Sequence, residues 1–297
     1  MPKLFFKMAA KENSSRGRHA KKSTPQKSSV KKMKTKNFRP NPQNVKTFKR
    51  KPNTTPKKEN VADGIRLNKY IANAGICSRR EADVYIAAGN ATVNGKIITE
   101  MGYKVQKDDV VRFDGALLSI ETKRYVLMNK PKNMITTMDD DRGRTTVMHI
   151  IESATKERIY PVGRLDRNTT GLLLFTNDGD LAKKLTHPKH NVKKLYHASL
   201  DKKLSMKDMQ TIGSNFMLEG KMVFVDAISY VEGQSKTEVG IEIHSGRNRI
   251  VRRIFENFGY TVVKLDRVIF AGLTKKNLPR GHYRPLTNQE VINMNMI

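Results

Sequence analysis

The apolar and polar positions of the chain first form a regular pattern just after residue 64. Four apolar residues recur there at intervals of one, three or four: Leu67, Tyr70, Ile71 and Ala74. This spacing predicts a helix, and Gly75 supplies the left-handed residue on which helices commonly end. A second helix is predicted from Ser78, which forms a capping-box pattern with Glu81, to Gly89.

Short runs rich in β-branched residues follow and predict two hairpins. Residues 91–93 and 96–98 flank Asn94 and Gly95, and residues 110–113 and 116–118 flank Asp114 and Gly115. Asn-Gly and Asp-Gly pairs accept the positive φ angles of tight two-residue turns. We therefore expect a small domain at residues 61–121, in which two helices lead into a small sheet.

Residues 122–290 carry a less regular alternation of strand and helix patterns. Runs typical of buried strands occupy residues 125–128, 171–175 and 238–243, and helical patterns occupy residues 204–209 and 250–258. A doubly wound parallel sheet would alternate the two patterns more strictly. This order predicts an α+β fold for the larger domain.

The positive charge of the chain is large and unevenly distributed. The formal net charge is +29, and residues 1–60 contain 19 Lys or Arg against 2 Glu. Because this segment has few apolar residues, we expect a disordered basic arm there. Such a charge favours a polyanionic partner, either nucleic acid or an anionic membrane surface. A mitochondrial transit peptide is the alternative interpretation of the arm, although lysine outnumbers arginine in it.

The single cysteine, Cys77, excludes an intrachain disulfide framework and indicates a reducing compartment. We interpret it as a structural residue. No apolar run reaches the length of a membrane span, and the first residues lack the apolar core of a secretory signal. These features predict a cytoplasmic protein with no membrane partner.

Two familiar kinds of site are disfavoured by their spacing. Residues 89–96 look like a phosphate-binding loop, but the glycines are one residue too far apart and Ile97 stands where Ser or Thr should bind magnesium. His187, His190 and His197 have no cysteine or carboxylate nearby to complete a convincing zinc set.

The candidate chemistry lies in residues 163–181, Gly-Arg-Leu-Asp-Arg-Asn-Thr-Thr-Gly-Leu-Leu-Leu-Phe-Thr-Asn-Asp-Gly-Asp-Leu. Asp166 stands between Arg164 and Arg167, whose charge keeps a carboxylate ionised and available as a nucleophile. Residues 168–171 predict a turn, and residues 172–175 predict a buried strand that would hold the loop rigid. A loop salt bridge is the alternative interpretation of Asp166.

The sequence resembles known families in two places. The span from Ile65 to Phe113 is similar to the alpha-L RNA-binding domain first described in a small-subunit ribosomal protein, through Arg-Leu-Asn-Lys-Tyr-Ile-Ala, Ala-Gly-Ile-Cys-Ser-Arg-Arg-Glu-Ala and Gly-Asn-Ala-Thr-Val-Asn-Gly-Lys. Residues 163–181 resemble the signature of the bacterial ribosomal RNA pseudouridine synthases. Residues 194–196, 246–255 and 268–273 also fit that family, as do Lys130 and Pro131. Asn133 stands where the family usually has glycine, but asparagine also tolerates a positive φ.

The second resemblance implies an enzyme that converts uridine to pseudouridine on a mixed, mainly antiparallel sheet flanked by helices. It places Asp166 on the catalytic aspartate, Tyr196 on the active-site tyrosine, and Arg252 on the basic residue that pairs with the aspartate. The reaction breaks the bond from the ribose to the base nitrogen and rejoins the base through carbon, so it needs no metal or organic cofactor. Because a duplex hides the target sugar, the uridine must be flipped or unpaired.

We expect the enzyme to be a monomer. Its expected partner is ribosomal RNA, either free or in a pre-ribosomal particle. The motifs look more similar to those of large-subunit (23S) enzymes than to those of small-subunit enzymes. The residues expected to hold RNA are all basic: Arg66, Lys69, Arg79, Arg80, Arg164, Arg167, Arg247, Arg249 and Arg253. A non-catalytic ribosome-assembly factor is the alternative, although such a protein has no reason to keep a carboxylate that repels phosphate.

Overall fold

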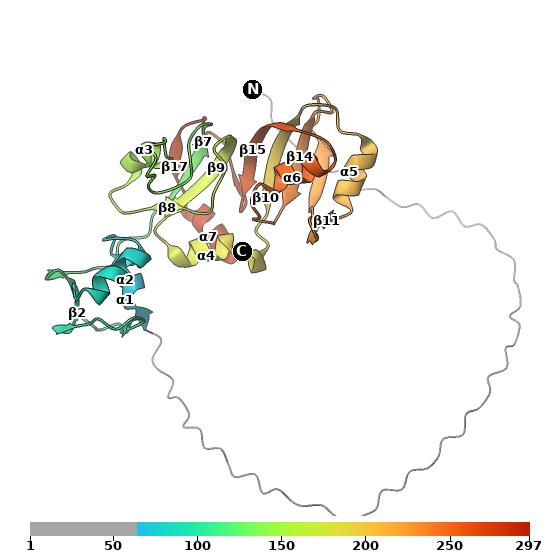
Figure 1. Cartoon of the computed structure of the whole chain (residues 1–297). Coiled ribbons are helices and arrows are strands. Elements are labelled where there is room, and N and C mark those ends of the chain that lie inside the picture. Colours follow the sequence, from blue (N-terminus) through green and yellow to red (C-terminus); the bar gives the residue numbers. More distant parts are fainter. Residues whose placement is uncertain (1–63) are drawn as a thin grey trace, which may run out of the picture. The chain divides into compact units, whose positions relative to one another are not determined.

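The computed structural model describes residues 64–297, so the predicted basic arm at residues 1–60 and its transit-peptide alternative lie outside the described residues. The chain is drawn in Figure 1. The first elements are β1 (Ile65–Arg66), α1 (Leu67–Asn73), α2 (Arg79–Ala87), β2 (Ala91–Val93), β3 (Lys96–Ile97), β4 (Lys104–Val105), β5 (Val111–Phe113) and β6 (Ala116–Leu117).

Local sequence signals form these first elements as predicted. At the start of α2 the Ser78 hydroxyl accepts from the amide of Glu81, and the amide of Ser78 donates to the Glu81 carboxylate, so both halves of the capping box are present. Asn94 and Gly95, with φ angles of 51° and 80°, make the turn that joins β2 to β3. The Cys77 side chain belongs to the core beneath the two helices, and its burial raises the pKa of the thiol.

The remaining elements build a larger α+β unit. They are β7 (Tyr125–Lys130), α3 (Met148–Ile151), β8 (Tyr160–Pro161), β9 (Thr169–Thr176), α4 (Gly179–Thr186), β10 (Lys194–Leu200), α5 (Met206–Gly213), β11 (Phe216–Leu218), β12 (Lys221–Val223), β13 (Ala227–Tyr230), β14 (Glu238–Ile243), α6 (Ile250–Asn257), β15 (Val262–Phe270), β16 (Leu273–Thr274), β17 (Tyr283–Pro285) and α7 (Asn288–Met296). Two short 3₁₀ turns follow α3 and α4.

A nine-stranded sheet organises this unit. Its continuous path runs β13-β14-β10-β15-β9-β7-β17, with β16 beside β15 and β8 beside β9. Neighbouring strands are antiparallel, except that β15 and β9 are parallel. The predicted α+β class and the mixed, mainly antiparallel sheet are confirmed.

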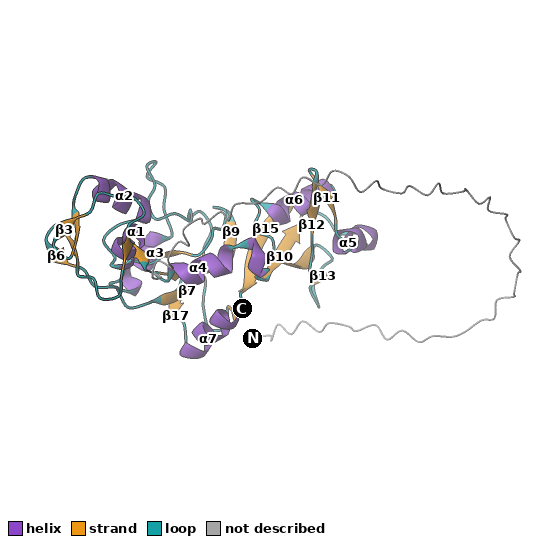
Figure 2. Cartoon of the chain, turned by 90° about the horizontal axis from the view of Figure 1, so that it is seen from below, coloured by secondary structure: helices purple, strands orange, loops and turns teal. Residues whose placement is uncertain are grey.

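Helices cover both faces of the sheet, because its strands bury side chains on both sides (Figure 2). Leu172 and Leu174 of β9 pack with residues of α4 and α7, whereas Leu173 and Phe175 of the same strand pack with α3. Helices α5 and α6 cover β10 and β14. None of the helices in residues 64–297 is long and apolar enough to cross a membrane.

Two sequence predictions about local structure need correction. The turn expected at residues 168–171 is shorter, because β9 already begins at Thr169 and pairs there with Leu265 of β15. The helix expected at residues 204–209 begins instead at Met206, two residues later, since the Ser205 hydroxyl accepts a hydrogen bond from the amide of Asp208 and caps α5 there. Pairing with a distant strand sets the first boundary, whereas a local cap sets the second.

Gly171 makes the parallel contact between β9 and β15 possible. Its φ is +109°, and a Cβ added there would lie 2.3 Å from the carbonyl oxygen of Arg267 and 2.5 Å from its amide nitrogen. Both atoms belong to the backbone, so they cannot move aside without disturbing the pairing. An alanine at this position therefore has no room.

We expect Gly171→Ala to lower the free energy of unfolding by at least about 2 kcal/mol, because it combines an unfavourable φ with overpacking. Gly115→Ala is a matched control, since Gly115 also has a positive φ, +80°, but has nothing within 4 Å of the added Cβ. The control should cost only about 1 kcal/mol. Urea unfolding of both variants measures the difference, and equal costs would contradict the proposed clash.

Candidate functional site

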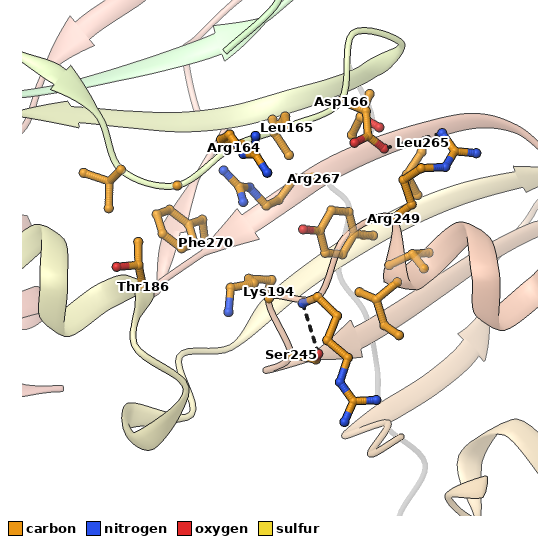
Figure 3. A pocket seen from close by; sticks show the side chains of 18 of the residues that line it. Arg164, Leu165, Asp166, Thr186, Lys194, Ser245, Arg249, Leu265, Arg267 and Phe270 are labelled. Carbon is orange, nitrogen blue, oxygen red and sulfur yellow. Dashed lines mark hydrogen bonds and ion pairs between the residues drawn. The ribbon is translucent and has the colours of Figure 1, made fainter. Parts of the chain in front are cut away.

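A cleft of about 170 Å³ opens at the middle of the sheet (Figure 3). It is bounded by the loop that leads into β9, by β10 and β15, and by the loop that precedes α6. Charged, polar, aromatic and apolar side chains line the cleft, among them Asp166, Thr169, Lys194, Tyr196, Arg249, Leu265, Arg267 and Phe270. An adjoining hollow of about 540 Å³ shares Asp166 and Arg249 with the cleft, so the cleft lies in a wider depression.

Asp166 faces two arginines that are distant in the sequence. The Oδ2 atom of Asp166 lies 3.9 Å from Nη1 of Arg249 and 4.0 Å from Nε of Arg252. Arg164 and Arg167, which the sequence predicted as its charge partners, are exposed, and no ion pair joins either of them to Asp166 within residues 64–297. Asp166 therefore lies among arginines as expected, and one of them, Arg252, is the residue that the resemblance pairs with it. The two flanking arginines are not its partners.

The two arginines beside Asp166 differ in burial. The side chain of Arg252 is 10% exposed, whereas that of Arg249 is 47% exposed. Arg252 is anchored because its Nη1 donates to the carbonyl of Val262 at 2.6 Å. Burial lowers the pKa of Arg252, as does Arg249, while Asp166 raises it. Since the Nε atom of Arg252 has no hydrogen-bond partner among residues 64–297, it remains available to a group placed beside Asp166.

Lys130 holds the loop that carries Asp166. It is fully buried, and its ammonium lies within hydrogen-bond distance of four carbonyl oxygens, those of Pro131 (3.1 Å), Asp166 (3.2 Å), Arg167 (3.3 Å) and Thr169 (2.9 Å). One cation thus ties the end of β7 to the whole turn before β9. The Asn133 φ is 66°, as predicted for a turn there.

Tyr196 lies on the floor of the cleft. It is half-buried on β10 and stands directly opposite Arg267 of β15, so the two residues share one face of the sheet. Leu265 stands two residues before Arg267 and also lines the cleft. The arrangement brings a carboxylate, a phenol ring, an apolar side chain and four guanidinium groups to one opening, those of Arg164, Arg247, Arg249 and Arg267.

Comparison with known proteins identifies the family of this chain. A family model described as RNA pseudouridylate synthase matches residues 124–257, and an S4 domain model matches residues 65–111. Ribosomal large subunit pseudouridine synthase B of Bacillus subtilis (strain 168) is 40% identical over 229 residues, which cover 76% of this chain and 93% of that protein. The chain belongs to the RNA pseudouridylate synthase family.

Two further comparisons support membership of this family. The dual-specificity RNA pseudouridine synthase RluF of Escherichia coli O157:H7 is 34% identical over 233 residues, covering 77% of this chain and 78% of that protein. A solved structure described as a crystal structure of pseudouridylate synthase matches with a TM-score of 0.57 and 28% identity, covering 77% of this chain and 99% of the other. The predicted family is confirmed, and this synthase is an isomerase with an S4 domain ahead of its catalytic domain.

The predicted catalytic residues of the synthase lie together, whereas the predicted RNA-binding residues are spread. Asp166, Arg252 and Tyr196 come from the loop before β9, from α6 and from β10. Among the basic residues, Arg164, Arg247 and Arg249 line the cleft and Arg167 lines the adjoining hollow, while Arg253 is ion-paired with Glu219. Four more lie in the S4 domain: Arg66, Arg79 and Arg80 are exposed and Lys69 is half-buried. Their contact with RNA stays a prediction.

The histidines that the sequence grouped together do not form a metal site. His187 and His190 have their rings 6.3 Å apart, and the Nε2 atom of His197 lies 2.7 Å from the carboxylate of Glu238. In the part of the chain that the structure describes, no three His, Cys, Asp or Glu side chains are grouped as metal ligands.

Two residues of the synthase site had no strong sequence signal. Arg267 lies in an ordinary strand pattern, and nothing local indicates that its side chain faces the cleft. Lys130 stands out in the sequence only as part of a Lys-Pro pair that fits the family. A lysine at the end of an apolar strand, 125–130, could have indicated a buried ammonium, but three of its four partners lie more than thirty residues away.

The ionisation of Lys130 predicts a pH effect on stability. Burial, the largest cause, lowers the pKa of Lys130 from 10.5 to about 8; Arg280 also lowers it, and Asp166 raises it. Between these two values the unfolded chain keeps the proton that the folded enzyme has lost, so rising pH favours the folded state. We expect the unfolding free energy of the wild type, relative to Lys130→Met, to rise by up to about 3 kcal/mol across this range.

Urea unfolding at several pH values, from about 7.5 to about 10.5, measures this difference. Lys264→Met is a matched control, because Lys264 is exposed on β15; this variant should follow the wild type at every pH. A constant difference between the wild type and Lys130→Met across the range would show that Lys130 does not titrate as inferred.

Proposed function

We propose that this enzyme converts a uridine of large-subunit (23S) ribosomal RNA to pseudouridine, with Asp166 acting on the ribose of the target nucleotide. The observation that carries the proposal is the position of the Asp166 carboxylate at the cleft, beside Arg249 and Arg252 and on a loop held by Lys130. The large-subunit target is supported by the relative from Bacillus subtilis, which is named for that subunit.

The chemistry follows from the charges at the cleft. The guanidinium groups of Arg249 and Arg252 offset the negative charge of the Asp166 carboxylate when bound RNA excludes water. The carboxylate then acts on the ribose, by attack on the sugar or by removal of a sugar proton. The bond from C1′ to N1 of the base breaks, the base rotates, and C5 bonds to C1′; C5 loses one proton and N1 gains one, so atoms and charge balance without a redox partner.

Tyr196 and Leu265 contact the base during this rotation. Both line the cleft on neighbouring strands of the sheet, β10 and β15. A phenol ring offers a flat surface for the uracil, and its hydroxyl can take part in the proton transfer that ends the reaction. An apolar side chain beside it keeps water from the broken bond.

The surrounding RNA is bound by basic residues around the cleft and in the S4 domain. Exposed arginines such as Arg247 and Arg79 hold phosphates, and their contribution weakens as salt concentration rises. The high positive charge, the single cysteine and the membership of an RNA-modifying family favour a cytoplasmic monomer that acts on free ribosomal RNA or on a pre-ribosomal particle.

Mapping of pseudouridine tests the proposal. The wild-type enzyme is incubated with unmodified large-subunit and small-subunit ribosomal RNA, both free and in immature particles, and pseudouridines are located by a selective adduct that stops reverse transcription. We expect a stop at a large-subunit uridine. A stop confined to small-subunit RNA would overturn the large-subunit target, and tight RNA binding without any stop would favour the assembly-factor alternative.

A further inference from the structure

Arg267 is a buried cation whose hydrogen bonding is incomplete. Its side chain lines the cleft although the residue is only 3% exposed. Its Nε donates to the carbonyl of Leu172 at 2.8 Å, and its guanidinium lies over the ring of Phe270, 4.5 Å from the ring centre. The Nη2 atom is buried and has no hydrogen-bond partner in the part of the chain that the structure describes. These contacts fix the guanidinium while leaving one of its donor groups unused.

Lys194 stands beside Arg267 in the same cleft. Its ammonium donates to the carbonyls of Val192 at 2.7 Å and His244 at 2.8 Å, which accounts for two of its three protons. Burial and, to a lesser extent, the charge of Arg267 lower the pKa of Lys194 to about 8, while Asp226 acts in the opposite direction. The carboxylate of Asp226 is itself bound by His244 at 2.9 Å.

These two cations lie at the end of the cleft away from Asp166. In Figure 3, Lys194, Arg267 and Arg164 gather toward Phe270 and Thr186, while Asp166 and Arg249 lie at the opposite end. Within residues 64–297, no ion pair joins a carboxylate to Lys194, Arg267 or Arg164. Placing like charges together in a partly buried site is unfavourable, and an anion bound between them would relieve this cost.

We propose that Lys194 and Arg267 form a subsite for a backbone phosphate next to the target uridine. This inference rests on the proposed function and deepens it. The target base fits this end less well, because the uracil N3–H group needs an acceptor and both side chains offer only donors. Since a phosphate is joined to its ribose by a few bonds, binding it here fixes where the sugar lies relative to Asp166, so the subsite positions the nucleotide for reaction.

The test measures binding to RNA that lacks one charge. A stem-loop containing the mapped uridine is prepared unmodified and with a neutral methylphosphonate at the phosphate on either side of that uridine. Binding is measured with Asp166→Asn protein, so that the RNA is not consumed. We expect one methylphosphonate to weaken binding by about 10- to 100-fold, the value of a charge-assisted contact.

The same substitution should matter little once the subsite is removed. In Lys194→Met added to the Asp166→Asn background, the sensitive methylphosphonate should cost less than about threefold, because the lost contact is the one it probes. Arg267→Lys, which keeps the buried charge but shortens its reach, should behave similarly. Lys193→Met is the control, since Lys193 is 67% exposed and paired with Glu242; it should keep the full methylphosphonate effect.

The outcomes separate this inference from the proposed function. If the wild-type enzyme forms no pseudouridine in the unmodified stem-loop or the longer RNA, the proposed function fails. The enzyme can instead form pseudouridine while a methylphosphonate weakens RNA binding by Lys194→Met and Arg267→Lys as much as it weakens binding by the parent Asp166→Asn protein. In that case only the phosphate subsite is overturned. If Arg267→Lys does not fold, Lys194→Met tests the subsite by itself, because it removes the ammonium and leaves an apolar side chain of similar length in its place.

Discussion

Asp166→Asn should abolish pseudouridine formation while RNA binding is retained. Asparagine has the size of aspartate but can neither attack a sugar nor accept a proton from it. We expect the rate of a single turnover to fall by at least about 10⁴-fold, as for other residues that react directly with substrate. Arg249 and Arg252, 3.9 Å and 4.0 Å from the carboxylate, remain in place to hold the RNA. Removal of one negative charge should leave RNA affinity equal or higher.

Two measurements complete this test. The rate is followed by single-turnover formation of pseudouridine with enzyme in excess, and affinity is measured by filter binding of the same RNA. Asp201→Asn is the matched control, because Asp201 is exposed. Its carboxylate accepts a hydrogen bond from the amide of Thr261 at 2.8 Å, which the asparagine side chain can also accept. A rate for Asp166→Asn within tenfold of the wild-type rate would exclude Asp166 as the reacting group.

Arg252→Met should slow the reaction far more than Arg249→Met. The two cations are almost equally distant from Asp166, but Arg252 is the more buried. Two unit charges 4 Å apart interact by roughly 4 kcal/mol near a protein surface and by about 1 kcal/mol in water. We therefore expect the single-turnover rate to fall by about 10² to 10³-fold for Arg252→Met, and by less than about tenfold for Arg249→Met.

Loss of folding must be separated from loss of charge, because Arg252 also donates to the Val262 carbonyl. Thermal unfolding of each variant reports on the fold. Arg252→Lys keeps the positive charge and should recover part of the rate lost in Arg252→Met. Equal losses in the two methionine variants, or a larger loss for Arg249→Met, would assign the pairing role to Arg249 or to both residues.

Local structure in this chain could be predicted from neighbouring residues. The capping box of Ser78 and Glu81 and the Asn94-Gly95 turn formed as expected, because caps and tight turns are made by groups a few residues apart. Where a distant partner intervened, prediction failed. β9 begins at Thr169 rather than after a longer turn, since that residue pairs with a strand almost a hundred residues later.

The sequence by itself determined the family, the α+β class and the candidate aspartate, because these depend on motifs and patterns that are continuous in the chain. Only the tertiary structure decided the surroundings of Asp166. The resemblance had named Arg252 as a neighbour, but the structure adds Arg249 in place of Arg164 and Arg167, and it shows that Lys130 holds the loop. Which side chains meet there depends on how distant strands pair to bury their apolar faces, and residues adjacent in the chain can point away from one another.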